Sequence, residues 1–163
     1  MGEPVTRVLT QADEPLVRSA TLENLNWAEE RFTMQDVLDR REFAHCTHLV
    51  LARGDFGFVA ERSDRPVGVV WVLVLPAEDA GYGFVTGHIP ELSLWVHADE
   101  RGRGLGRRLL RLAQAEARRR GIAAVSLSVE SGNVAKNLYR DEGFQPVHGR
   151  DRDGVMIWAA YGQ

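Results

Sequence analysis

One segment of the chain is rich in arginine and glycine and reads Arg101-Gly102-Arg103-Gly104-Leu105-Gly106. It follows residues 91–96, whose alternating apolar side chains predict a β-strand, and precedes residues 105–120, whose apolar side chains recur at helical spacing. The first N–H groups of a helix lack intrahelical partners and lie at the positive end of its dipole, and glycine lets an anion approach them. The segment therefore predicts a phosphate-binding turn.

Two common phosphate-binding motifs do not fit this segment. A P-loop needs G-x-x-x-x-G-K-[ST], and no lysine followed by serine or threonine occurs here. A Rossmann turn needs G-x-G-x-x-G, whereas these glycines occupy positions 102, 104 and 106 and follow no βαβ unit. A glycine-rich helix cap without a ligand is the alternative interpretation.

A second motif follows the predicted strand at residues 122–129. It reads N-x-A-x-x-L-Y-x-x-x-G-F and runs from Asn133 through Tyr139 to Phe144. Together with [Q/R]-x-x-G-x-[G/A], which Arg101, Gly104 and Gly106 match, it resembles the GNAT superfamily of N-acetyltransferases. The resemblance is specific over residues 91–147 and only architectural before them.

The resemblance implies acetyl-CoA as cosubstrate and assigns it a set of residues. Asn133 would contact the pantetheine arm, and Tyr139 would serve as general acid. A bulge in the preceding strand would expose backbone N–H groups to the thioester oxygen. The implied cofactor-binding residues are Leu94, Trp95, Val96, Arg101, Gly102, Arg103, Gly104, Leu105, Gly106, Arg107 and Asn133.

These residues also have plainer interpretations. Tyr139 could be a core aromatic at a helix end, and Asn133 could be a helix N-cap, a position that asparagine favours. Glu91 is the best candidate for the general base because it belongs to the strand that would line the site. His88, His97 or a chain of water molecules are the alternatives for that role.

Composition limits the possible classes of function. The 163 residues suffice for a single domain, 1–163, and the net charge of −3 gives no overall attraction to nucleic acid. A nucleic-acid binder using the arginines of residues 101–120 is therefore a disfavoured alternative. Cys46 is the only cysteine and permits no intrachain disulfide, and no apolar run predicts a signal or membrane segment, so we expect a cytoplasmic protein without a membrane partner.

The acceptor is less well defined by the sequence. His45, Cys46 and His48 are spaced too tightly for a usual zinc site, and we expect no metal. Aromatic and acidic residues that could line an acceptor pocket hint at a cationic amine, although core packing and a solvated helix face explain them equally well. They are Trp27, Phe32, Tyr82, Phe84 and Trp95, and Glu29, Glu30, Asp36, Asp39 and Glu42. The acceptor is expected to be a small-molecule or protein amine, and a homodimer is possible.

The order of the predicted elements indicates an α/β (α+β) fold. Helices are expected after Thr10 and from Thr33 to about Phe43, and a loop over 76–90. Strands are predicted over 5–9, 56–60, 67–75, 91–96, 122–129, 144–147 and 155–160, and further helices over 105–120 and 132–142. The resemblance implies a GNAT-like mixed, twisted sheet of about six to seven strands with helices on both faces.

The sequence thus predicts an acetyl-CoA-dependent N-acetyltransferase that transfers acetyl to a primary amine by direct attack in a ternary complex. The alternative is a catalytically silent acyl-CoA-binding regulatory module. Tyr139 favours the enzyme, because a silent module has no use for a general acid.

Overall fold

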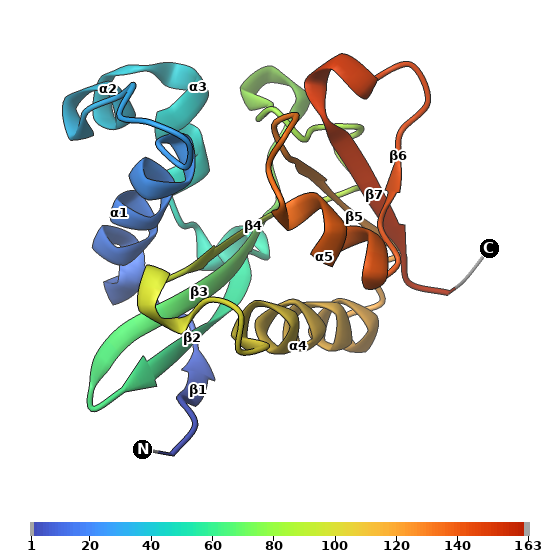
Figure 1. Ribbon diagram of the computed structural model, residues 1–163. Helices are drawn as coiled ribbons and strands as arrows, with labels where there is room; N and C mark the ends of the chain where they lie inside the picture. Colours follow the sequence, from blue (N-terminus) through green and yellow to red (C-terminus); the bar gives the residue numbers. More distant parts are fainter. Residues whose placement is uncertain (1, 162–163) are drawn as a thin grey trace.

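The computed structural model describes residues 2–161 and contains seven strands and five α-helices in that range. The strands are β1 (Val5–Val8), β2 (Phe56–Arg62), β3 (Arg65–Leu73), β4 (Glu91–Val96), β5 (Ala124–Ser128), β6 (Gln145–Pro146) and β7 (Val155–Ala159). The helices are α1 (Glu14–Leu25), α2 (Met34–Asp39), α3 (Arg41–Ala44), α4 (Leu105–Arg119) and α5 (Ala135–Asp141). All strands form one sheet in the order β1-β2-β3-β4-β5-β7-β6, in which only β4 and β5 are parallel neighbours (Figure 1).

Helices cover both faces of this sheet, as predicted. Successive side chains of β3 project to opposite faces of the sheet, so Val69 and Trp71 pack with α1, whereas Val70 and Val72 pack with α4 and α5. The buried stripe of α4 contains Leu105, Leu109 and further apolar residues one and two turns on. The sheet therefore separates two apolar clusters, with α1 on one side and α4 and α5 on the other (Figure 1).

The β2–β3 hairpin is closed by a two-residue turn. Ser63 and Asp64 have φ values of 51° and 63°, and Arg62 pairs with Arg65 across the turn. Two successive left-handed residues match the twist of the flanking strands. The hairpin supplies β3, which is the strand that holds β4 in register.

Strands β4 and β5 separate soon after they meet. Their register contains one Cα pair, Glu91 with Ser126. Beyond this pair, β4 continues to follow β3 as far as Val96, while β5 pairs with β7. The carboxyl ends of β4 and β5 lead to the starts of α4 and α5. The region between the two diverging strands, with both helix starts beside it, is called the wedge below.

Some boundaries differ from the prediction. The helix expected over 33–43 is two helices, because Arg40 adopts an extended ψ of 122° and its guanidinium lies over the rings of Phe32 and Phe43 at 5.3 and 5.7 Å. The last helix begins at Ala135 rather than at residue 132, and the strand predicted over 144–147 is reduced to β6.

Candidate active site

The edge of β4 that faces the wedge carries backbone N–H donors that no residue within 2–161 pairs. His97 N–H donates to the carbonyl of Val67 at 2.8 Å, which fixes the alternation of the antiparallel β3–β4 ladder. Hydrogen-bonded and non-hydrogen-bonded pairs alternate in such a ladder. Trp95 therefore exchanges hydrogen bonds with β3, whereas the N–H groups of Leu94 and Val96 point toward the space that β5 has left.

This alternation corrects two details of the prediction. Trp95 was expected to share the role of backbone donor, but its N–H faces β3, and its side chain is buried against α1. A bulge was expected to expose the donors, but the β3–β4 register runs without a shift from Glu91 to Val96. The donors are exposed because β5 diverges, not because β4 is distorted.

The arginine- and glycine-rich turn lies at the carboxyl end of β4 and leads directly into α4. Gly104 precedes the helix with a φ of 84°, and its carbonyl accepts the first helical bond, from Arg108 N–H at 3.0 Å. Residues 101–104 are exposed. The N–H groups that follow Gly104 belong to the first turn of α4 and lack intrahelical partners. This start of α4 is therefore the predicted anion-binding site.

Gly106 brings the three walls of the wedge together. A Cβ built on Gly106 would lie 3.3 Å from the Leu138 side chain of α5, and 3.6 and 3.7 Å from Val96 and Leu94 of β4. The helix start, the free edge of β4 and α5 are therefore separated by little more than this missing side chain. A glycine here lets the start of α4 pack closely against side chains of β4 and α5.

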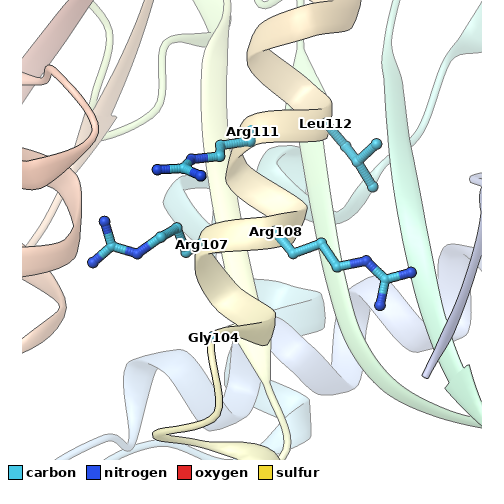
Figure 2. Close-up of a pocket in the computed structure, with 5 residues that line it drawn as sticks. All are labelled: Gly104, Arg107, Arg108, Arg111 and Leu112. Carbon is cyan, nitrogen blue, oxygen red and sulfur yellow. The ribbon is translucent and has the colours of Figure 1, made fainter. Parts of the chain in front are cut away.

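Basic side chains surround the helix start. A surface hollow of about 350 Å³ is lined by Gly104, Arg107, Arg108, Arg111 and Leu112, and Figure 2 shows Arg107 and Arg111 on one side of α4 and Arg108 and Leu112 on the other. A second hollow of about 250 Å³ shares Gly104 and Arg108 with the first and includes Arg103. The turn therefore borders two hollows that contain arginine side chains.

These arginines differ in their availability to a ligand. Arg107 and Arg111 both bind Glu142, and these guanidinium partners hold the pKa of that carboxyl below its usual range. Arg101 donates through Nε to the carbonyl of Val96 at 3.0 Å. Arg103 forms no hydrogen bond or ion pair within residues 2–161, which leaves its guanidinium free to meet a phosphate.

Tyr139 lies on α5, and Asn133 lies two residues before this helix. Asn133 Oδ1 accepts from the N–H of Ala135, the first residue of α5, at 3.0 Å, although the N-cap position itself is held by Val134. The amide nitrogen of Asn133 forms no hydrogen bond within residues 2–161 and stays available. Tyr139 is buried beside Phe144, with ring centroids 5.9 Å apart. Its hydroxyl forms no hydrogen bond to any part of the chain that the structure describes, and burial raises the pKa of Tyr139 to about 12.

Glu91 lies at the closed end of the wedge. Its carboxylate accepts from the N–H groups of Gly81 and Gly83 at 3.1 and 2.9 Å. Burial raises the pKa of Glu91, and these two bonds oppose the rise by favouring the charged form. Ser126 holds the same loop through Oγ, which donates to the carbonyl of Gly83 at 2.6 Å.

The alternative bases are placed less favourably. His88 is exposed on the loop, and the Nδ1 of His97 accepts from the N–H of Asp99. His45, which we considered only as a metal ligand, is mostly buried and has Nδ1 3.0 Å from Asp79. Over residues 2–161, no three histidine, cysteine, aspartate or glutamate side chains gather as a metal site.

Several residues expected near the acceptor do meet in space. Phe32 and Phe43 pack edge to face at 5.0 Å, and Tyr82 follows at 6.2 Å from Phe43. Trp27 donates to Glu130, which follows β5, at 3.1 Å. The segment between α1 and α2 therefore reaches the loop between β5 and α5.

Two residues at the end of α1 escaped the sequence analysis. Asn24 Nδ2 donates to the carbonyl of Leu94 at 3.0 Å, and Glu23 accepts from the indole of Trp95 at 2.6 Å. A polar residue on an amphipathic helix is common, so no local pattern could have distinguished these two.

A parallel strand pair that separates beside a glycine turn at a helix start is the arrangement that the two motifs imply for an acetyltransferase. The chain belongs to the acetyltransferase (GNAT) family, whose model matches residues 20–144. This confirms the family inferred from the two motifs, and the protein is an enzyme of that family. No curated protein sequence gives a significant match.

Solved structures share the fold over nearly the whole chain. A GNAT acetyltransferase from Staphylococcus aureus Mu50 has a TM-score of 0.70 at 13% identity, covering 96% of this chain and 99% of that chain. YncA from Salmonella typhimurium, solved with its cofactor acetyl-CoA, has a TM-score of 0.66 at 22% identity, covering 99% and 96%. A ribosomal-protein-alanine N-acetyltransferase from Brucella melitensis has a TM-score of 0.63 at 26% identity, covering 95% and 99%.

Between residues 2 and 161, the structure contains no helix with the length and apolarity required to cross a bilayer.

Proposed function

We propose that this acetyltransferase uses acetyl-CoA and transfers the acetyl group to a primary amine by direct attack, with both substrates bound together in a single domain, 1–163. The observation that carries the proposal is the wedge itself. It combines backbone N–H donors on the edge of β4 with an anion-binding helix start. Tyr139, whose hydroxyl has no partner within residues 2–161, lies on α5, the helix that follows β5.

The residues of the wedge fit acetyl-CoA. The helix start at Gly104 and the guanidinium of Arg103, which has no partner within residues 2–161, suit a pyrophosphate. The edge of β4 that β5 has left suits a narrow chain such as pantetheine. The amide of Asn133 would contact that chain. Arg107 would first have to exchange Glu142 for a phosphate, so its contribution is secondary to that of Arg103.

Each reacting group has an assigned partner. Bound acetyl-CoA supplies an activated acetyl thioester. One N–H group on the free edge of β4, that of Leu94 or that of Val96, would donate to the thioester oxygen as in an oxyanion hole. Glu91 takes one proton from the amine as the N–C bond forms, and Tyr139 gives one proton to the sulfur as the C–S bond breaks, so the proton count of the protein is unchanged.

Two classes of acceptor are to be compared experimentally. The Brucella relative acts on a ribosomal-protein alanine, which supports a protein N-terminus as one candidate. A cationic amine is the other candidate, and beside the aromatic row of Phe32, Phe43 and Tyr82 it would compete with Arg31 for Glu130 and with Arg40 for Glu42. A thiol-release assay with acetyl-CoA against small amines and peptides with N-terminal alanine separates them. Absence of release with every amine, combined with tight CoA binding, would support the silent acyl-CoA-binding module instead.

Replacing Gly104 with valine is expected to weaken CoA binding at least about tenfold. The branched side chain would stand at the helix start, where nothing else lies within 4 Å of the added Cβ, and would keep a phosphate from the N–H groups. Isothermal titration calorimetry with CoA measures the change.

The matched control is Gly121→Val. Gly121 lies beyond the other end of α4, has a similar φ of 74° and also has open space at the Cβ position. Both variants impose the same left-handed strain, so they should lose similar stability, and only Gly104→Val should lose affinity. Equal affinities in the two variants would remove the turn from the cofactor site.

A further inference from the structure

The last turn of α1 holds two consecutive residues of β4 at the point where β4 has left β5. Asn24 binds the backbone carbonyl of Leu94, and Glu23 binds the side chain of Trp95. Trp95 is buried in the apolar cluster on the α1 side, so its indole fixes the direction from which α1 approaches. The two bonds tie one helical turn to the middle of the proposed donor edge.

The bond from Asn24 acts on the free edge of β4. Leu94 stands opposite Val70 in a non-hydrogen-bonded pair, so its N–H and its carbonyl both point away from β3. Because β5 no longer pairs with β4 here, this carbonyl would lack a partner without Asn24. Arg101 donates a hydrogen bond to the carbonyl of Val96 in the same way. Side chains thus pair the carbonyls of Leu94 and Val96, and the N–H groups of these two residues remain as donors.

We infer that Asn24 is a positioning residue for acetyl transfer, which occupies the Leu94 carbonyl and so reserves the neighbouring N–H for the acyl oxygen. The inference rests on the proposed function, which places the thioester oxygen at this edge. The N–H and carbonyl of one strand residue project side by side, so a carbonyl without a partner would repel an incoming acyl oxygen. The amide of Asn24 offsets that negative charge and fixes the orientation of the carbonyl.

Leu94 is a better donor to the acyl oxygen than Val96 because of its place along the strand. It lies closer to Glu91, the proposed base, whereas the carbonyl of Val96 is held by Arg101 of the phosphate turn. The acyl group and the acceptor amine must meet near the base. Asn24 therefore supports the donor at the reacting end of the edge.

The test compares two ligands in the full-length protein. CoA lacks an acyl oxygen, whereas acetonyl-CoA is a ketone analogue that keeps the oxygen but cannot transfer its acyl group. Asn24→Asp keeps the shape of the side chain, but its carboxylate cannot donate to the Leu94 carbonyl. We expect the affinity for acetonyl-CoA relative to CoA to fall about tenfold and kcat to fall about tenfold, with the Kd of CoA within about twofold.

Ser19→Ala on the same helix is the control, because Ser19 is exposed and its hydroxyl bonds only within α1. This variant should bind both ligands as the wild type does.

The wild-type enzyme provides a second readout by NMR if Asn24→Asp does not fold. The Leu94 amide signal should shift with acetonyl-CoA and not with CoA. An equal loss of affinity for both ligands in a folded variant overturns the inference. A Leu94 amide signal that does not shift when acetonyl-CoA binds also overturns it. A wild-type protein that binds neither ligand contradicts the proposed function itself and the inference with it.

Discussion

Tyr139→Phe is expected to lower kcat about 10²-fold, at the lower end of the range for general acid catalysis. The substitution keeps the ring that packs on Phe144 and removes only the hydroxyl. That hydroxyl forms no hydrogen bond within residues 2–161, so its loss should leave the melting temperature nearly unchanged. Because burial raises the pKa of Tyr139 to about 12, the hydroxyl stays protonated at neutral pH and can act as an acid.

Steady-state kinetics and a CoA titration on the same variant decide between the possible roles. The Kd of CoA should stay within a few-fold of wild type if the hydroxyl only protonates the thiolate. Tyr161→Phe is the control, since Tyr161 is exposed and its hydroxyl contacts only the carbonyl of Arg118. Full activity in Tyr139→Phe would leave Tyr139 as a packing residue, and lost CoA binding at normal melting would make its hydroxyl a ligand contact.

Glu91→Gln is expected to lower kcat/KM about 10²-fold or more and to remove the acidic limb of its pH profile. A base acts in its deprotonated form, so activity falls as the pH drops through its pKa. Burial raises the pKa of Glu91, so in wild type this limb should lie above the usual range of a glutamate. The pH dependence of kcat/KM, measured in both proteins, checks the assignment.

The substitution also disturbs a structural contact, which needs its own control. Glutamine replaces one acceptor oxygen by a donor and so loses one of the bonds from Gly81 and Gly83. Ser126→Ala loosens the same loop by removing the bond to the Gly83 carbonyl, but keeps the carboxylate. If the acidic limb remains in Glu91→Gln, the base is water or a histidine. If the limb is lost in Ser126→Ala, the loop and not the carboxylate sets the pH profile of kcat/KM.

The fold was largely readable from local patterns. The strand, the turn and the helix over residues 91–119 were predicted because alternation, glycine and helical spacing act within a few residues of one another. The second motif, from Asn133 to Phe144, was equally local, and the two together indicated the family.

Boundaries that depend on distant contacts were predicted less well. Arg40 interrupts a helical pattern where its guanidinium stacks on Phe32 and Phe43, and no periodicity within 33–43 contains that information. The short β6 likewise depends on its pairing with β7, because Gln145 and Pro146 are the only residues that keep the register.

The sequence by itself determined the elements, the family and the residue types available for chemistry, since these follow from short-range spacing. Only the tertiary structure decided which groups are free. The register with β3 turns the N–H groups of Leu94 and Val96 toward the wedge and that of Trp95 away from it. Arg107 forms an ion pair, and the Leu94 carbonyl a hydrogen bond, with residues far away in the chain. The Tyr139 hydroxyl forms no hydrogen bond with any described residue. A one-residue change of register would reverse the donor assignment without altering any local pattern, which is why the sequence could name the candidates but not choose among them.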